Sequence, residues 1–272
     1  MKTQTYEDLE VSVGDLHAII RMNRPQKKNA FNPRNNAAMA QVLDMLDTHD
    51  ALKVIVLTGV DDVFCGGMDL EEYFFDAFDK PEQLRANFRG AHSWMRRWKE
   101  HRAVTVASIN GWCIGGGMLI AGLCDIALTA DDATFCLSEI NFGIFPGGGT
   151  TWMVAQHLPR KLALYYTLTA ERFDGRRAEA LGLVSRSVPK AELAAPTDAL
   201  IASLTSKNKH ALTYVKRVYE RSRTMTFPEA QEWEVAMLSD LSAVTENEWI
   251  RSALAQFKRR KFRPALEPSP EK

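Results

Sequence analysis

The segment NGWCIGGGML (110–119) passes from a β-type run into three consecutive glycines and then into residues of helical composition. This order predicts a strand, a tight turn and a helix N-terminus, which offers free backbone N–H groups and a positive dipole. Glycines at such a turn carry no side chain, so a ligand can approach the backbone closely. Gly115, Gly116 and Gly117 are therefore candidates for holding a phosphate or a developing oxyanion, although a single triplet also fits a plain tight turn.

A second glycine turn favours the ligand-binding interpretation. The segment FCGGMDL (64–70) follows the β-type run KVIVLTG (53–59), and its Met68 N–H is free to face the same point as Gly116. Two backbone donors from two strand-to-helix turns would form an oxyanion hole. Because no GxGxxG or GK[ST] pattern surrounds these glycines, a nucleotide cradle of the Rossmann or P-loop kind is disfavoured.

The rest of the chain predicts an α/β fold. Four β-branched runs, each followed by turn or helix signals, read as buried parallel strands: 16–22, 53–59, 104–110 and 125–130. Helices are expected from Asn32 and Pro33 to about Asp50, and from Pro81 to Trp98. From Ala191 onward the pattern is helical throughout, with apolar faces too large for the segment to cover by itself. We therefore expect an α/β core domain (1–190), a C-terminal helical region (191–265) and a disordered tail (266–272).

The composition excludes several classes of protein. The 272 residues include 34 basic and 34 acidic side chains, so no overall field exists to gather nucleic acid or an anionic membrane. No apolar run is long enough for a membrane span, and no leader pattern opens the chain, so a soluble cytoplasmic protein is expected. The four cysteines lack CxxC spacing and the six histidines lack partners at ligand spacing, so we expect no metal site.

The glycine segments, together with SEINFGIFPGGGT (138–150), NRPQKKNAF (23–31) and RAEALGLVSRSVP (177–189), resemble the crotonase, or enoyl-CoA hydratase/isomerase, superfamily. The resemblance runs from about Tyr6 to Phe262. It implies a spiral of ββα units with a C-terminal helical trimerisation region, and a homotrimer or dimer of trimers. It also implies an acyl-CoA substrate, no separate cofactor, and oxyanion donors at the N–H groups of Met68 and Gly116.

Within the superfamily the chain is most similar to the hydroxycinnamoyl-CoA hydratase-lyases, through GMDLEEYF (67–74), NGWCIGGG and ATFCLSEINFGIFPGG (133–148). Those enzymes hydrate an aryl enoyl-CoA ester and cleave the product to an aromatic aldehyde and acetyl-CoA. The resemblance also implies a set of CoA-binding residues: Lys27, Lys28, Ala30, Gly66, Asp69, Leu70, Phe257 and Arg260. Of these, Phe257 and Arg260 would approach the CoA of a neighbouring subunit.

Glu139 is the candidate acid/base group. Apolar residues flank it, and they would desolvate its carboxyl group and raise its pKa towards neutrality. By resemblance, the glutamate of this motif moves the proton at the carbons of the thioester. The plain alternative is a glutamate that caps a helix or a turn.

Three further residues are expected to face the acyl group. Leu119 stands where classical hydratases have a second glutamate and where the hydratase-lyases place a serine nearby. Tyr73 falls where the hydratase-lyases have a tyrosine that contacts the ring hydroxyl, although packing beside Phe74 and Phe75 fits it equally well. Gly147 stands about where the dehalogenase branch has its nucleophilic aspartate, which counts against that branch.

Three functions follow as hypotheses. The first is hydration of an enoyl-CoA double bond, alone or followed by retro-aldol cleavage of an aryl substrate. The second is an enoyl-CoA isomerase in which Glu139 alone moves the proton, which Leu119 favours. The third, of another class, is a non-catalytic RNA-binding relative, against which the neutral charge and the set Met68, Gly116 and Glu139 count.

Overall fold

The computed structural model describes residues 1–77 and 79–261. Within them, one sheet has seven strands in the order β1-β2-β3-β4-β6-β8-β10. Their bounds are β1 (Lys2–Tyr6), β2 (Leu9–Val13), β3 (His17–Met22), β4 (Val54–Gly59), β6 (Val104–Ile109), β8 (Ile126–Ala130) and β10 (Arg186–Val188). From β3 to β10 all neighbours are parallel, as expected, whereas the unpredicted pair β1 and β2 forms an antiparallel edge.

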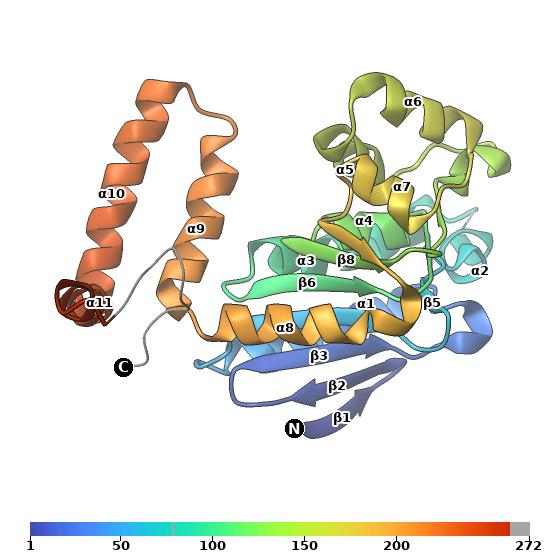
Figure 1. Ribbon diagram of the computed structural model, residues 1–272. Coiled ribbons are helices and arrows are strands. Elements are labelled where there is room, and N and C mark those ends of the chain that lie inside the picture. Colours follow the sequence, from blue (N-terminus) through green and yellow to red (C-terminus); the bar gives the residue numbers. More distant parts are fainter. Residues whose placement is uncertain (78, 262–272) are drawn as a thin grey trace.

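Apolar side chains on both faces of the central strands explain the layers. One face of the sheet packs against α1 (Pro33–Asp47) and α3 (Pro81–Glu100) through the main hydrophobic core. The other face carries valines of β4 and β6, which pack against Ile201 of α8 (Ala194–Thr205). Figure 1 shows α8 running along one face of the sheet, with α1 and α3 behind it. Continuous burial on both faces is typical of parallel strands in α/β proteins.

A smaller parallel sheet brings the glycine segments together. It consists of β5 (Val63–Cys65), β7 (Trp112–Ile114) and β9 (Phe135–Cys136), in that order. The carboxyl ends of these three strands lead directly into the three segments 64–70, 110–119 and 138–150. Because carboxyl ends of parallel strands meet at one edge, the three loops converge there.

The remaining helices cover the edges of the core and form the C-terminal region. The α-helices are α2 (Leu70–Tyr73), α4 (Gly116–Gly122), α5 (Thr150–His157), α6 (Arg160–Thr169), α7 (Gly175–Ala180), α9 (Lys209–Ser222), α10 (Phe227–Thr245) and α11 (Glu248–Lys258). The short 3₁₀ helices are η1 (Pro25–Lys27), η2 (Phe75–Ala77), η3 (Ser138–Phe142) and η4 (Lys190–Glu192).

The helical C-terminal region is confirmed as far as Lys258, and it projects from the core (Figure 1). Helices α10 and α11 bury no residue fully and expose a row of large apolar side chains: Phe227, Val235, Leu238, Val244, Ile250, Leu254 and Phe257. Large apolar side chains exposed in this number on two neighbouring helices are typical of an interaction face. The tail expected to be disordered (266–272) lies outside the described residues.

Both predicted helix starts lie where expected, and a side-chain cap is present at α1. Asn32 caps α1, accepting from the N–H of Asn35 at 2.8 Å, and the Asn35 side chain accepts from the N–H of Asn32 in return. Pro33 and Pro81 each occupy the first turn of their helix, where the missing N–H costs nothing. Helix α1 ends at Asp47, three residues before the predicted end.

Candidate active site

Two backbone N–H groups meet where the first two glycine loops converge. A Cβ atom built on Gly116 would lie 3.5 Å from Met68 N, and one built on Gly67 would lie 3.4 Å from Gly116 N. Neither N–H has a hydrogen-bond acceptor among the described residues. The chain on either side of Met68 is fixed by Phe31, whose N–H donates to Gly67 O (2.8 Å) and whose carbonyl accepts from Asp69 N (2.7 Å). Two free, adjacent and rigidly held donors are the arrangement that an oxyanion requires.

Glu139 lies over the turn at Gly115. Its Oε1 is 2.6 Å from the position that a Cβ atom on Gly115 would occupy, so only glycine leaves room for this carboxyl group. Gly115 also has a φ of 51° and a ψ of −115°, a backbone conformation that other residues rarely adopt. The turn that frees the Gly116 N–H therefore also receives the acid/base candidate.

The environment of Glu139 suits proton transfer. Its Oε2 is buried and has no hydrogen-bond partner within residues 1–77 and 79–261. Burial raises the pKa of this carboxyl group, and a hydrogen bond from its own backbone N–H lowers it only in part. A buried carboxyl group that has one oxygen without a partner and holds its proton more tightly than usual is typical of a catalytic acid or base.

A cavity of about 180 Å³ joins these groups. Its polar lining consists of the side chains of Ser138 and Glu139 and the backbone of Met68, Gly66, Gly67, Gly115 and Gly116. Its apolar lining consists of Leu70, Phe74, Ile114, Phe142 and Ile144. Apolar walls exclude water and strengthen the electrostatic effect of the donors. The cavity therefore combines a site for a developing negative charge with a nearby proton acceptor.

A buried ion-pair network holds α2 beside the cavity. The Arg24 guanidinium donates to Asp69 Oδ2 at 2.7 Å and to Glu72 Oε1 at 2.8 Å, and its side chain is 5% exposed. Although burial raises the pKa of Asp69, the hydrogen bond and charge of Arg24 lower it overall. Because Asp69 also caps α2 through the N–H groups of Glu71 and Glu72, Arg24 fixes the segment that follows the Met68 donor.

Most of the residues expected to bind CoA lie on this side of the molecule. The loop 24–30 and the segment 66–70 are joined by the Gly66 N–H, which donates to Lys28 O at 2.8 Å. Lys27 pairs with Glu71 at 2.8 Å, and Lys28 Nζ lies 6.0 Å from the centre of the Trp112 ring. Ala30 is buried and accepts from Arg24 through its carbonyl, so it contributes to the fold of this loop.

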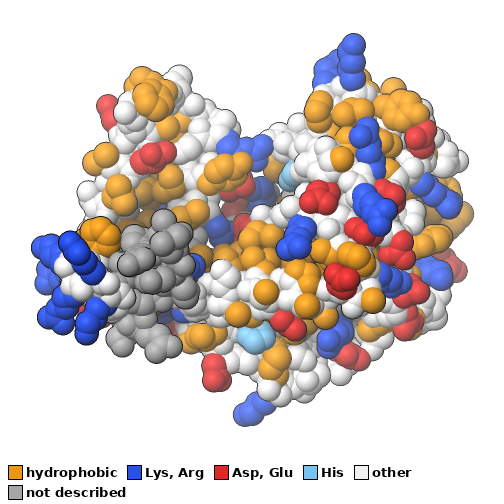
Figure 2. Space-filling view, in the orientation of Figure 1, with side chains coloured by type: hydrophobic (Ala, Val, Ile, Leu, Met, Phe, Trp, Pro, Cys, Tyr) orange, Lys and Arg blue, Asp and Glu red, His pale blue; other side chains and the backbone are white. Residues whose placement is uncertain are grey.

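Phe257 and Arg260 are far from the cavity within one chain. Phe257 is exposed on α11, and Arg260 follows the end of that helix. In Figure 1, α11 and α2 lie at opposite ends of the molecule. Figure 2 shows basic side chains gathered around α11. Any contact of these two residues with CoA at this cavity would have to come from another copy of the chain.

The residues expected to face the acyl group are not among those that line the cavity. Leu119 is 4% exposed, and its methyl groups lie 3.6 and 3.7 Å from the position of a Cβ atom on Gly149. Gly147 is half-buried in the same glycine loop. Tyr73 is fully buried, and its ring contacts that of Phe88, with 5.8 Å between the ring centres.

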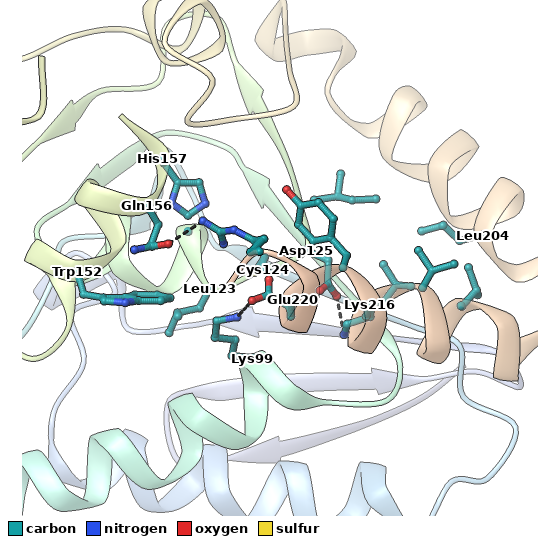
Figure 3. Close-up of a pocket in the computed structure, with 17 residues that line it drawn as sticks. Lys99, Leu123, Cys124, Asp125, Trp152, Gln156, His157, Leu204, Lys216 and Glu220 are labelled. Atoms are coloured by element: carbon teal, nitrogen blue, oxygen red, sulfur yellow. Dashed lines mark hydrogen bonds and ion pairs between the residues drawn. The ribbon is translucent and has the colours of Figure 1, made fainter. Parts of the chain in front are cut away.

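A second cavity, of about 400 Å³, lies between α9 and the core, and Figure 3 shows its lining. Two ion pairs lie in it, Lys99 with Glu220 at 2.6 Å and Lys216 with Asp125 at 2.7 Å, and Arg223 donates to Gln156 at 2.6 Å. Neither Glu139 nor the two free donors line it. We interpret it as the space where the C-terminal region meets the core, and not as the site of chemistry.

Within the described residues, no group of three or more His, Cys, Asp or Glu side chains could hold a metal ion. No helix in that part of the chain is long and apolar enough to cross a membrane. The four cysteines are free, and burial raises the pKa of each thiol, which makes all four weak nucleophiles.

Sequence reasoning missed several residues of this site. Phe142 and Ile144 line the cavity, and their position in the motif INFGIF, directly after Glu139, could have identified them. Arg24 opens the segment RPQKKNAF, but nothing in the sequence marks it as buried. Asn36 lies in the predicted helix that starts at Asn32 and Pro33, and no sequence pattern marks it as buried, whereas it is 3% exposed and donates to Tyr73.

Known proteins resemble this chain in sequence over most of its length. A family model described as enoyl-CoA hydratase/isomerase matches residues 16–263. A hydroxycinnamoyl-CoA hydratase-lyase of Pseudomonas fluorescens is 38% identical over 247 residues, which cover 89% of this chain and 88% of that protein. A peroxisomal Delta(3,5)-Delta(2,4)-dienoyl-CoA isomerase of Arabidopsis thaliana is 30% identical over 257 residues, covering 88% of this chain and 92% of that protein.

The fold is also shared with solved structures. The crystal structure of an enoyl-CoA hydratase from Polaromonas sp. JS666 matches with a TM-score of 0.85 at 23% identity, over 97% of this chain and 98% of the other. The predicted α/β architecture with its C-terminal helices is therefore confirmed.

Proposed function

The chain belongs to the enoyl-CoA hydratase/isomerase family, and we propose that it hydrates a hydroxycinnamoyl-type CoA ester and cleaves the adduct to an aromatic aldehyde and acetyl-CoA. The observation that carries the chemistry is the unpartnered carboxyl group of Glu139 beside the free N–H groups of Met68 and Gly116. The choice of substrate rests on the 38% identity to a hydroxycinnamoyl-CoA hydratase-lyase.

In the first step, water adds across the double bond. The water oxygen bonds to the β-carbon, and the electron pair of the double bond moves toward the thioester oxygen as an enolate. The N–H groups of Met68 and Gly116 stabilise that oxygen, an effect worth about 10²–10³ in rate for one donor. Glu139 accepts a proton from the water and returns one to the α-carbon, which gives the β-hydroxyacyl-CoA ester.

In the second step, Glu139, again a carboxylate, accepts the proton of the β-hydroxyl group, which it later returns to the α-carbon, and the bond between the α- and β-carbons breaks. Its electron pair becomes the enolate of acetyl-CoA, held by the same two donors, while the β-carbon leaves as an aldehyde. Protonation of the enolate at the α-carbon completes acetyl-CoA. One carboxyl group and one oxyanion hole therefore serve both steps.

We also propose assembly into a trimer through the C-terminal region. The exposed apolar row on α10 and α11 supports it, since a monomer would leave that surface in water. In such an assembly Phe257 and Arg260 would reach the CoA of a neighbouring copy, where Lys27 and Lys28 approach it from the other side.

A second candidate function is an enoyl-CoA isomerase. Leu119 favours it, because this buried apolar side chain offers no second polar group to position a water molecule. Glu139 would then remove a proton from one carbon and return it to another, with the same enolate between the two transfers.

The products distinguish the candidates. The purified chain is incubated with feruloyl-CoA, coumaroyl-CoA, crotonyl-CoA and a 3-enoyl-CoA, and the products are identified by mass spectrometry. We expect an aromatic aldehyde and acetyl-CoA from the two aryl esters. A hydrated adduct alone would indicate a plain hydratase, and double-bond migration without water uptake would indicate an isomerase.

A further inference from the structure

Among the described residues that line the active-site cavity, Glu139 and Ser138 are the two whose side chains carry oxygen. They are neighbours in the chain and open the 3₁₀ helix η3. The rest of the polar lining is backbone, at the glycine turns and at Met68. Because Glu139 is assigned to proton transfer, Ser138 is the polar side chain of the cavity to which the mechanism gives no role.

The hydroxyl group of Ser138 is available to a ligand. It makes no hydrogen bond within residues 1–77 and 79–261. Its oxygen is accessible, whereas Oε2 of Glu139 is buried. A half-buried serine hydroxyl usually bonds to nearby backbone, so one that lines a cavity without such a bond can take up a small polar molecule.

Backbone contacts on both sides of Ser138 fix its position. Before it, the carbonyl of Cys136 accepts from Gly115 N at 2.9 Å. After it, the carbonyl of Glu139 accepts from Ile144 N at 3.3 Å. Since the turn at Gly115 also receives the Glu139 carboxyl group, the hydroxyl and carboxyl groups are both held at one cavity.

Hydration requires more than one acceptor at the attacking water. A water molecule that turns a lone pair toward the β-carbon has two protons to place, and each needs an acceptor. Glu139 accepts the proton that leaves. The N–H groups of Met68 and Gly116 can only donate, and Leu119 is buried and apolar. Ser138 Oγ is therefore the side-chain acceptor that the described lining offers to the second proton.

We propose that Ser138 is a second catalytic residue, whose hydroxyl oxygen holds the attacking water while Glu139 takes its proton. This inference rests on the proposed function and adds the group that places the nucleophile. The water oxygen bonds to the β-carbon, and the electron pair of the double bond moves to the thioester oxygen. One water proton passes to Glu139, the other stays on the new hydroxyl group beside Ser138 Oγ, and Ser138 keeps its own proton.

The two steps of the reaction differ in their need for Ser138. In hydration the water is a separate molecule, and its placement contributes to the rate. In cleavage the β-hydroxyl group is already joined to carbon, so the covalent bond sets its position. Loss of the Ser138 hydroxyl group should therefore slow hydration much more than cleavage.

Ser138→Ala tests this difference. Hydration is measured as the single-turnover loss of coumaroyl-CoA with the protein in excess, and cleavage as aldehyde release from 3-hydroxy-3-(4-hydroxyphenyl)propanoyl-CoA supplied directly. We expect hydration to fall about 100-fold and cleavage by no more than about threefold. Ser138→Thr, which keeps a hydroxyl group, should restore most of the hydration rate.

Two controls accompany these rates. Because the Ser138 hydroxyl group makes no hydrogen bond within the described part of the chain, Ser138→Ala should unfold at the same urea concentration as the wild type. Ser93→Ala removes an exposed hydroxyl group from α3 and should change neither rate.

Equal losses of hydration and cleavage in Ser138→Ala would mean that Ser138 only keeps the Glu139 turn in shape. Unchanged hydration would mean that the water is held elsewhere. Either result would overturn the inference and leave the proposed function standing, since the wild type would still release the aldehyde. A wild-type protein that turns over neither ester would refute the proposed function, and the inference with it.

Discussion

Replacing Glu139 with Gln should lower kcat by about 10²–10⁴-fold while the dissociation constants of CoA esters change little. The amide keeps the size of the carboxyl group but cannot take a proton from water or carbon. Because Oε2 of Glu139 has no partner among the described residues, its loss breaks no structural interaction. Steady-state kinetics on coumaroyl-CoA and direct binding to the same ester measure the two effects separately.

The pH dependence provides a second signature of the same residue. Burial raises the pKa of Glu139, and proton removal requires the carboxylate, so kcat/KM should rise with pH through an apparent pKa above the ordinary value for Glu of about 4.3. In Glu139→Gln, the residual kcat/KM should not show this fall at low pH. A variant with the wild-type rate and profile would remove Glu139 from the mechanism.

The contribution of Glu139 to the free energy of unfolding should fall as pH rises, whereas kcat/KM should rise. A raised pKa means that the folded state binds the proton more tightly than the unfolded state, so Glu139 weakens folding as pH rises from the unfolded pKa to the folded one. Above that range, Glu139→Gln should therefore unfold at the same or a higher urea concentration than the wild type. The exposed Glu100→Gln is the matched control, for which we expect no change in rate or stability.

Gly115→Ala should reduce kcat/KM by about 100-fold or more, although it changes no group that we assign to the chemistry. Its methyl carbon would lie 2.6 Å from Glu139 Oε1, so the carboxyl group must move. The φ of 51° also places the new side chain in a strained conformation, at a cost of about 1–2 kcal/mol. Both effects disturb the turn that presents the Gly116 N–H.

Gly182→Ala is the control for backbone strain, because it introduces that strain without displacing the Glu139 carboxyl group. Gly182 has a φ of 75°, and nothing lies within 4 Å of a Cβ atom built on it. Both variants should lose similar stability in urea unfolding, but only Gly115→Ala should lose activity. If the two variants retained equal activity, the close approach of Glu139 to Gly115 would have no catalytic meaning.

The sequence predicted the parts of this fold that depend on local pattern. The runs 53–59 and 104–110 are rich in β-branched residues and are followed by turn signals, which predicts strands, and both became central strands. The β1–β2 edge was missed because its first strand is mostly exposed and polar, so no burial pattern marks it.

The site was predictable to the extent that its chemistry lies in glycine turns. Met68, Gly116 and Glu139 come from three loops whose meeting point follows from parallel strands, and the structure brings them together. The contacts that hold the segment after Met68 were not predictable, because Arg24 acts on residues 45 and 48 positions away. No local pattern encodes such contacts.

The central claim is that Glu139 and the two backbone donors form an enolate at a CoA thioester. The most direct measurement uses 3-(4-hydroxyphenyl)propanoyl-CoA, a saturated ester that can be neither hydrated nor cleaved, incubated with the protein in D₂O. Mass spectrometry should show deuterium incorporated at the carbon next to the thioester with the wild type, and none above background with Glu139→Gln. A wild-type protein that binds this ester without exchange, or a Glu139→Gln variant that exchanges at the same rate, would contradict the account.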